Sequence, residues 1–376
     1  MPKVKNWQIG REMEYPYPES KPQKQVAFIF DVNKCIACQS CTMACKTTWT
    51  SGKGQEYVFW NNVESKPYGF YPLGWDVQTL GLLGQQKWSG GKYEGKTVFE
   101  AARDQESVLG YLPNERDYES PNLAEDECSA NVERGDHIKG VHKKWGFYLA
   151  RICNHCAYPA CLAACPRKAI YKRAEDGIVL IDQKRCRGYR ACVEACPYKK
   201  PFYNNTTRVS EKCIACYPKR EASGEQTQCV TTCIGKIRLN GFKSVDPAQA
   251  NKDNPIDYLI HVRKIALPLY PQFGTQPNVY YIPPVHVDPK FLLQMFGPGA
   301  EEAVKLYRSA PADKELLAAL TLFGCAEAIV DKFKAEGDVA VGLDDKGAET
   351  VRVPVREPSF VREFSQKSGA FLYNNS

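Results

Sequence analysis

Cysteines constrain this chain more than any other feature of its sequence. The 376 residues include 17 cysteines, and all but Cys128 and Cys325 fall into four tight groups. Disulfide scaffolds are usually short secreted chains, and cysteines two residues apart are poorly placed to pair with each other. The grouping therefore predicts metal centres. The groups are, in order, Cys35, Cys38, Cys41 and Cys45; Cys153, Cys156, Cys161 and Cys165; Cys186, Cys192 and Cys196; and Cys213, Cys216, Cys229 and Cys233.

The spacing within the groups is typical of iron–sulfur clusters, for which bacterial ferredoxins use the run C-x2-C-x2-C-x3-C-P. Group one has this spacing without the proline. Groups two and three end in Cys165-Pro166 and Cys196-Pro197, and group four has a 12-residue insert between its two pairs. Zinc is the alternative metal, because paired C-x2-C motifs also bind it. A zinc site does not need the repeated C-x3-C-P ending, so the pattern favours iron–sulfur clusters.

The last cysteine of each group is predicted to bind the cluster of a partner group, because it lies on a helix and points away from the loop before it. Two short apolar runs, 169–173 and 178–182, flank a turn that ends in Gly177 and predict a hairpin between groups two and three. Groups two and three then pair, and groups one and four pair. The predicted ligand sets are Cys35, Cys38, Cys41 and Cys233 (cluster A); Cys45, Cys213, Cys216 and Cys229 (cluster B); Cys153, Cys156, Cys161 and Cys196 (cluster C); and Cys165, Cys186 and Cys192 (cluster D).

Cluster D lacks a fourth thiolate, because Tyr189 stands where group three would have its second cysteine. Tyrosine is a poor iron ligand, so Tyr189 is interpreted as a non-ligand beside a [3Fe–4S] cluster. Clusters A, B and C are expected to be [4Fe–4S]. The alternative for cluster D is a [4Fe–4S] cluster with tyrosinate or water as its fourth ligand. Because cluster type affects reduction potential, we expect a higher potential for cluster D than for most of its neighbours.

The expected fold class is α+β: two interlocked bacterial-ferredoxin-like modules holding four iron–sulfur clusters, with a long insertion and a mainly helical C-terminal region. The insertion is interpreted as a partner surface, and a separate small domain is the alternative. The predicted divisions are an N-terminal extension (1–26), the first cluster motif (27–48), the insertion (49–143), a ferredoxin-like core with three cluster motifs (144–242) and the C-terminal region (243–376). In that last region we expect helices at 254–267, 289–296, 313–323 and 326–334, and a hairpin at 339–355.

Other functional classes find little support. The formal charge is +7, but it counts thiolates as neutral, and four oxidised clusters with their thiolates contribute roughly −8. There is no compact Lys/Arg run, so no nucleic-acid partner is expected. No apolar stretch is long enough for a membrane span, and the N-terminus shows neither an apolar signal segment nor a twin-arginine pair. We find no nucleotide loop and no nucleophile with a base, which favours a carrier over a catalyst.

Weaker candidates lie around the groups. His155, between Cys153 and Cys156, either hydrogen-bonds a cluster sulfur or simply packs beside it. Cys128 and Cys325 are interpreted as free thiols. The basic residues that flank group three either balance cluster charge or are solvated: Arg187, Arg190, Lys199 and Lys200.

Four sequence runs carry a resemblance to one family: KCIACQSCTMACKTTW, FWNNVESKPYG, KRCRGYRACVEACPYKKP and RVSEKCIACYP followed by CVTTCIGKIR. Over residues 27–300 the chain resembles the iron–sulfur beta subunit of the nitrate-reductase-like branch of the dimethyl-sulfoxide-reductase molybdoenzymes. The resemblance implies three [4Fe–4S] clusters and one [3Fe–4S] cluster, with Tyr189 matching an aromatic residue that replaces the missing cysteine. Formate dehydrogenase and polysulfide reductase beta subunits usually have the full cysteine set, so Tyr189 argues against them.

The resemblance also implies partners and a role. The chain is expected to relay electrons between a molybdenum-containing catalytic alpha subunit and a haem-containing gamma subunit or cytochrome, with no substrate chemistry of its own. FWNNVESKPYGFYPLGWDV looks most like nitrite oxidoreductase beta subunits, within the nitrite oxidoreductase and nitrate reductase type. Some of these have Asp at the position of Cys45, whereas the cysteine here implies an all-cysteine cluster B. Related complexes act on chlorate, perchlorate, selenate, dimethyl sulfide or ethylbenzene.

The same resemblance suggests a compartment. The chain is expected to be exported with its alpha subunit to the periplasm or to an equivalent extracytoplasmic compartment such as the anammoxosome. The cytoplasmic face of the membrane is the alternative.

Overall fold

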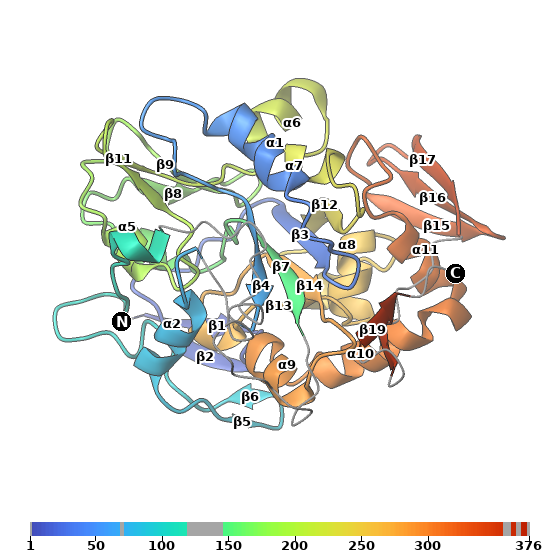
Figure 1. The fold of residues 1–376 in the computed structure, drawn as a ribbon, viewed down its shortest axis with the longest axis horizontal. Helices are drawn as coiled ribbons and strands as arrows, with labels where there is room; N and C mark the ends of the chain where they lie inside the picture. Colours follow the sequence, from blue (N-terminus) through green and yellow to red (C-terminus); the bar gives the residue numbers. More distant parts are fainter. Residues whose placement is uncertain (1, 68–70, 119–145, 356–361, 366–369, 374–376) are drawn as a thin grey trace.

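A four-stranded sheet lies at the centre of the computed structural model, which describes residues 2–67, 71–118, 146–355, 362–365 and 370–373 (Figure 1). Its strand order is β12-β3-β14-β13. β3 (Gln25–Asp31) is buried along its whole length, as expected for a central strand rich in β-branched and aromatic residues. It pairs antiparallel with β12 (Arg238–Lys243) and parallel with β14 (Val279–Ile282), which pairs antiparallel with β13 (Leu267–Pro268).

Each cysteine group is preceded by a strand and contains or precedes a short helix. The strands are β3 for group one, β7 (Phe147–Arg151) for group two, β9 (Val179–Ile181) for group three and β11 (Val209–Glu211) for group four. The helices are α1 (Ser40–Trp49), α4 (Ala160–Ala163), α5 (Ala191–Ala195), α6 (Tyr217–Ser223) and α7 (Gln228–Thr231). α4 packs against α5, and α1 packs against α7. The helices therefore bring group two beside group three, and group one beside group four.

Two hairpins connect the last three cysteine groups. β8 (Ile170–Lys172) pairs antiparallel with β9, which confirms the hairpin predicted between groups two and three. β10 (Phe202–Asn204) pairs antiparallel with β11 and leads the chain into group four. Because both hairpins are local, they keep the three groups close together in space.

The N-terminal extension and the described part of the insertion belong to the body of the protein. β1 (Lys3–Asn6) and β2 (Arg11–Glu14) form a hairpin that buries apolar side chains. β4 (Asn62–Lys66) pairs antiparallel with β7, so this part of the insertion is not a separate domain. The insertion also contains α2 (Trp75–Leu83), the paired β5 (Trp88–Ser89) and β6 (Lys92–Tyr93), and the 3-10 helix η1 (Glu115–Tyr118). Residues 119–145, with Cys128, lie outside the described residues.

The C-terminal region is mixed, and the prediction that it is mainly helical was wrong. It supplies β13 and β14 to the central sheet and forms a second sheet from β15 (Lys332–Glu336), β16 (Val339–Leu343) and β17 (Glu349–Pro354), which contains the predicted hairpin. β18 (Arg362–Ser365) pairs with β19 (Ala370–Tyr373). Its helical segments are η2 (Pro247–Gln249), α8 (Pro255–Asp257), η3 (Tyr258–Val262), η4 (Pro271–Phe273), α9 (Pro289–Phe296), α10 (Ala300–Ser309), η5 (Ala310–Ala312) and α11 (Lys314–Thr321).

Two predicted helices begin where expected, whereas one predicted helix ends early and another is absent. Asp288 and Asp313 accept hydrogen bonds from the first turns of α9 and α11, which begin within one residue of the predicted ranges 289–296 and 313–323. The helix that begins after Asn254 ends at Val262, because Lys264 adopts a positive φ and Leu267 joins β13. Residues 326–334 are not helical: Ala328 forms a β-bridge and Phe333 is buried between exposed neighbours, the two-residue period of a strand.

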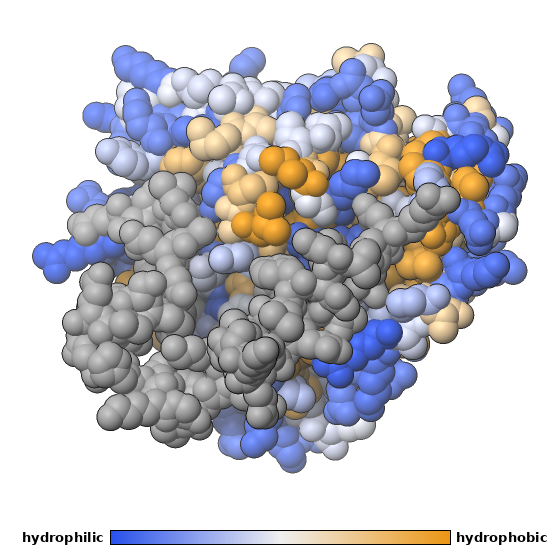
Figure 2. All heavy atoms as spheres, turned by 45° about the vertical axis from the view of Figure 1, so that its right-hand side comes forward, coloured by the Kyte–Doolittle hydropathy of each residue, from blue (hydrophilic) through white to orange (hydrophobic). Residues whose placement is uncertain are grey.

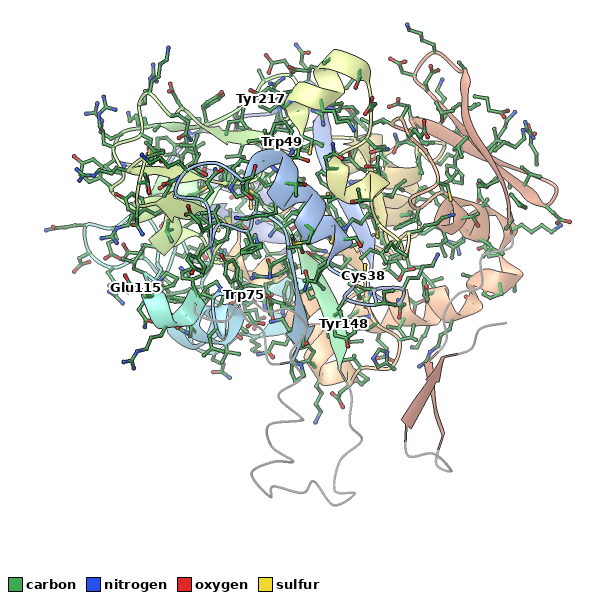
Figure 3. All side chains as sticks on the ribbon, turned by 45° about the horizontal axis from the view of Figure 1, so that its top comes forward. Cys38, Trp49, Trp75, Glu115, Tyr148 and Tyr217 are labelled. Carbon is green, nitrogen blue, oxygen red and sulfur yellow. The ribbon has the colours of Figure 1, made fainter. Side chains whose placement is uncertain are left out.

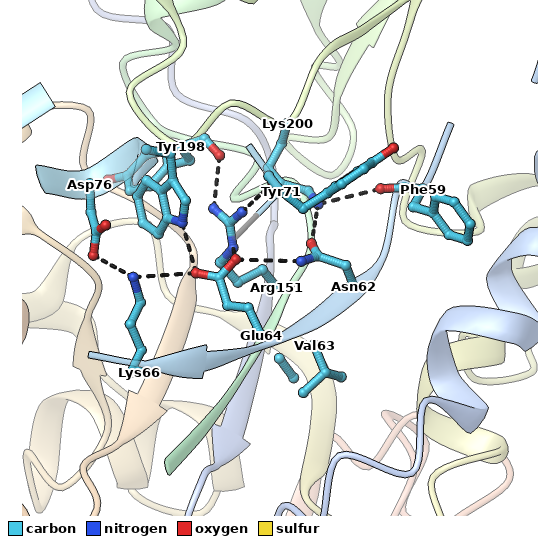
Figure 4. A network of polar contacts seen from close by, with 12 residues as sticks. Phe59, Asn62, Val63, Glu64, Lys66, Tyr71, Asp76, Arg151, Tyr198 and Lys200 are labelled. Atoms are coloured by element: carbon cyan, nitrogen blue, oxygen red, sulfur yellow. Dashed lines mark hydrogen bonds and ion pairs between the residues drawn. The ribbon is translucent and has the colours of Figure 1, made fainter. Parts of the chain in front are cut away.

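A buried network of charges joins β4, β7 and α2 (Figure 4). Glu64 on β4 lies 2.8 Å from Arg151 Nε and 3.3 Å from Lys66 Nζ, and it accepts a hydrogen bond from Trp75 Nε1 at 2.7 Å. Burial would raise the pKa of Asp76, but the ammonium group of Lys66 holds that pKa below its usual value. The network anchors the insertion beside the strand that leads into group two.

Among the described residues on the face shown in Figure 2, hydrophilic side chains cover the periphery, and apolar patches lie between them. Within the described residues, no helix has the length and apolar character that crossing a membrane requires.

Loss of the Glu64 charge should destabilise the fold. Glu64→Gln leaves Arg151 buried without its carboxylate, and breaking a buried pair in this way costs about 3–5 kcal/mol. Glu349→Gln is the matched control, because Glu349 forms an exposed pair with Arg352. We expect a clearly lower melting temperature for the Glu64 variant and an unchanged one for the control. Equal melting temperatures would show that the network does not stabilise the protein.

Candidate metal centres

The four cysteine loops share one backbone feature. In each group, the residue just before the second cysteine position has a positive φ: Ala37 (53°), His155 (41°), Gly188 (66°) and Ala215 (51°). This turn directs amide groups toward the sulfurs, and the N–H of Ala215 donates to Cys213 Sγ at 3.4 Å. The amide of Ala37 makes the same contact with Cys35. At position 188 only glycine fits, because a Cβ atom would lie 2.4 Å from the carbonyl oxygen of Arg208.

A second amide contact recurs at the last cysteine of three groups. The N–H group four residues further on donates to the cysteine sulfur: Ala169 to Cys165 (3.3 Å), Ile237 to Cys233 (3.4 Å) and Lys200 to Cys196. Amide donors favour the thiolate over the thiol. They also favour the more negative, reduced state of a cluster, and so help to set its reduction potential.

The structure gathers cysteines from different groups around three cavities. Each cavity contains three cysteines of one group, or two in the case of group three, and the last cysteine of another group. The cysteines that line the three cavities are Cys153, Cys156, Cys161 and Cys196; Cys165, Cys186 and Cys192; and Cys45, Cys213, Cys216 and Cys229. These are the groupings expected for clusters C, D and B.

The remaining four cysteines also lie together, beside a buried arginine. Burial raises the pKa of Cys35 to about 12, and the nearby Cys41 and Cys233 contribute to the rise. Burial raises the pKa of Cys41 as well, and the nearby Cys38 contributes to that rise. Cys38 is exposed, in the loop just before α1 (Figure 3). Arg238 Nη2 lies 3.0 Å from Cys41 Sγ, so a fixed positive charge faces this set.

Tyr189 lines the cavity of Cys165, Cys186 and Cys192, but its side chain is 67% exposed. A ring so largely in solvent does not fill the place of a fourth thiolate. The loop around Tyr189 keeps the backbone turn of the other groups. Group three therefore keeps the positive φ before this position but has a tyrosine where the other groups have a cysteine.

The basic residues around group three divide into two kinds. Lys199 and Lys200 are buried, and burial lowers the pKa of each to about 7. Lys200 lines the cavity of Cys153 and is held by Asn62 Oδ1 at 2.7 Å, at one end of the Glu64 network (Figure 4). Arg187 and Arg190 are exposed, at the edge of the cavity beside Tyr189.

Sequence reasoning missed two buried cations and an indole. Lys212 lines the cavity of Cys153 and donates to the carbonyl oxygen of Cys213 at 3.1 Å. Trp49 Nε1, near Tyr217 in Figure 3, donates to Cys216 Sγ at 3.2 Å. The third missed residue is Arg238. Arg238 is the first residue of the buried strand that follows group four, and a charged residue at such a position is a signal that could have identified it.

His155 is fully enclosed. Its Nδ1 accepts a hydrogen bond from the N–H of Val179 at 3.2 Å, so the proton of the neutral ring lies on Nε2. Burial lowers the pKa of His155 well below its usual value. The Nε2 atom is buried without a hydrogen-bond partner among the described residues.

The donor sets fit iron–sulfur clusters. Within the described residues, no three His, Cys, Asp or Glu side chains converge closely enough to bind a single metal ion. The cysteines of clusters B, C and D instead line cavities. The described cysteines are all free thiols. Thiolates held apart, with amide donors and buried cations around them, are the environment that a bound cluster needs. Fold and sites together define a ferredoxin-like iron–sulfur protein.

Comparison with known proteins identifies the family. A family model described as "4Fe-4S dicluster domain" matches residues 144–243. The selenate reductase beta subunit of Thauera selenatis is 42% identical over 313 residues, covering 75% of this chain and 89% of the relative. The chlorate reductase beta subunit of Ideonella dechloratans is 42% identical over 314 residues, with the same coverage. The respiratory nitrate reductase 1 beta chain of Escherichia coli is 33% identical over 367 residues, covering 70% of each chain.

The chain belongs to the family of iron–sulfur beta subunits of the dimethyl-sulfoxide-reductase-type molybdenum oxidoreductases. This confirms the family predicted from the cysteine runs and excludes the zinc alternative for residues 144–243. The chain is an electron-transfer subunit of an oxidoreductase complex and not its catalytic subunit.

Replacing Cys196 tests whether groups two and three exchange their last cysteines. Cys196→Ser should remove or alter one four-iron EPR signal and leave a three-iron signal intact, because Cys196 lines the cavity of Cys153, Cys156 and Cys161. Cys325→Ser is the matched control, since the thiol of Cys325 lies outside these cavities and donates to Thr321 O. Loss of the three-iron signal in the Cys196 variant would contradict the exchange.

Proposed function

We propose that this chain carries three [4Fe–4S] clusters and one [3Fe–4S] cluster in two interlocked ferredoxin-like modules, with clusters A to D held by the ligand sets given above. The observation that carries this proposal is the crossing of the last cysteines. Cys196 lies with group two, Cys165 with group three and Cys45 with group four. Such crossing is how two-cluster ferredoxins share their fourth ligands.

The three-iron assignment rests on Tyr189. The cavity of cluster D has three cysteines and an outward-facing tyrosine, while the other two cavities have four cysteines each. A cubane with three thiolates lacks a protein ligand at its fourth iron, which is the site that a [3Fe–4S] cluster leaves out.

The proposed partners are a molybdenum-containing alpha subunit and a haem-containing gamma subunit or cytochrome, between which the chain relays electrons. Two exposed regions support docking at opposite ends of the cluster series. Ile36 and Ile234 are 54% and 68% exposed and adjoin cysteines of the cluster A set. Tyr189, Arg187 and Arg190 are exposed at cluster D. Between these ends, Lys200 and Lys212 line the cluster C cavity, and Lys212 also contacts the cluster B residue Cys213.

The proposed complex is of the nitrite oxidoreductase and nitrate reductase type. This is supported by the resemblance in FWNNVESKPYGFYPLGWDV and by a Haloferax mediterranei respiratory nitrate reductase beta subunit that is 44% identical over 283 residues. The 42% identity to selenate and chlorate reductase beta subunits favours a second candidate, a complex acting on such oxyanions. Export with the alpha subunit to an extracytoplasmic compartment is the proposed location.

Replacing Tyr189 with cysteine tests the three-iron assignment. Tyr189→Cys supplies the absent thiolate, so the three-iron EPR signal of the oxidised protein should disappear and a further four-iron signal should appear on reduction. Iron and sulfide analysis should show one additional iron per chain. If the three-iron signal survives unchanged in the variant, Tyr189 is not the reason for it.

Tyr171→Cys is the control, because Tyr171 is also exposed and follows the cavity-lining Ile170 on β8, but does not itself line the cavity. The control should keep the three-iron signal. If the unsubstituted protein, purified with its complex, has no three-iron signal at all, the proposed cluster count is wrong.

A further inference from the structure

Arg238 occupies an unusual position for an arginine. It is the first residue of β12, has no exposed surface and pairs with Phe30 across the central sheet. Its guanidinium carbon lies 4.3 Å from the centre of the Phe30 ring, which fixes the plane of the group. The sheet therefore holds a permanent positive charge in the interior, because arginine does not lose its proton in proteins.

The guanidinium faces the cysteines of groups one and four. Nη2 donates to Cys41 Sγ at 3.0 Å and to Asn61 Oδ1 at 3.3 Å. Asn61 in turn donates to the carbonyl oxygen of Cys41 at 3.1 Å, so Arg238 and Asn61 hold this cysteine from two sides. Against the opposing effect of burial, the negative charges that raise the pKa of Arg238 are those of Cys41, Cys229, Cys233 and Cys35, in that order.

Two donors of Arg238 point to a further acceptor. Nε and Nη1 are buried and have no hydrogen-bond partner among the described residues. Buried donors without acceptors are destabilising, so native sites rarely leave them unmatched. The inorganic sulfides of an iron–sulfur cluster are such acceptors, and Cys41 of the cluster A set lies 3.0 Å from Nη2 of the same guanidinium. The other fully buried arginine, Arg151, has a carboxylate partner in Glu64, whereas no ion pair with a carboxylate is found for Arg238 among the described residues.

We propose that Arg238 sets the reduction potential of cluster A, by raising it above the value that the same four thiolates would give alone. The inference rests on the proposed assignment of Cys35, Cys38, Cys41 and Cys233 to one cluster. Reduction adds one negative charge to the cluster, and a cation buried in contact with a ligand sulfur stabilises that charge more than water-screened cations do. Arg238 thus acts through the Cys41 ligand, as a residue that tunes the cluster without binding iron.

The competing explanation is that Arg238 only shapes the loop, by stacking on Phe30 and holding Asn61. The two explanations predict different results for a variant that retains a positive charge at position 238. Arg238→Lys keeps a cation but loses the planar fork and its stacking, whereas Arg238→Gln loses the charge and keeps some hydrogen-bonding capacity. A purely structural role would affect cluster content, whereas a role in tuning would shift a midpoint potential with the cluster retained.

The experiment is a potentiometric titration of the intact complex followed by EPR. Arg238→Gln should move the midpoint potential of one four-iron cluster to more negative values and leave the three-iron midpoint unchanged. Arg238→Lys should move the same midpoint less. Arg190→Gln is the matched control, because it removes an exposed arginine beside cluster D and should not move the cluster A midpoint. Cys38→Ser identifies the signal, since it should perturb the same four-iron species.

Two results would overturn the inference. One is a set of four-iron midpoints that stays unchanged in Arg238→Gln. The other is loss of the same cluster in both Arg238 variants, which would make the residue structural. If Arg238→Gln alone loses the cluster, the midpoint in Arg238→Lys decides, and an unshifted value there rejects the inference. Absence of four-iron signals from the unsubstituted complex would instead refute the proposed function.

Discussion

Burial of negative charge is the constraint on which this structure depends. A cluster with four thiolates carries about −2, and the protein interior must supply compensation in the form of dipoles and cations. The chain does so with backbone amides turned toward Cys213 and Cys165 and with buried side chains such as Lys200 and Arg238. Lys200 depends in turn on Asn62 and, through it, on Glu64. The insertion between groups one and two is therefore part of the electrostatic environment of the sites.

Much of the fold and of the candidate sites could be predicted from the sequence, because the decisive signals are local. The spacing of cysteines, the turn before Ile178 and the capping residue Asp288 act within a few residues, and the hairpin and α9 form as expected. The misses have two different causes. Residues 326–334 become partly strand because β16 pairs with Lys332–Glu336, and Arg238 faces Cys41 across 197 positions. The first miss is a local hairpin whose strand period at Lys332–Glu336 was interpreted as a helix, and only the second involves partners distant in sequence.

The loop at Tyr189 shows how a protein can change a cluster site without rebuilding it. Gly188 has the same positive φ as Ala37 and Ala215, and Cys186 Sγ accepts an amide hydrogen bond from Ser210. The main chain thus keeps the turn before position 189, where the side chain is a tyrosine and not a cysteine. Backbone dipoles and ligand number are separate factors that act on cluster potential. This loop changes the number of ligands while it keeps the backbone dipoles.

The topology of the central sheet sets an order of assembly. β3 is made early, but its neighbours β12 and β14 lie more than 200 residues further along the chain, so the sheet cannot form until most of the protein has been synthesised. The hairpins β8–β9 and β10–β11 need only adjacent segments and close quickly. The half of the protein built from groups two and three can therefore fold while the N-terminal strand and its cysteines remain unpaired. During synthesis, the thiols of group one are the ones that wait longest for their partners, and they need the longest protection from oxidation.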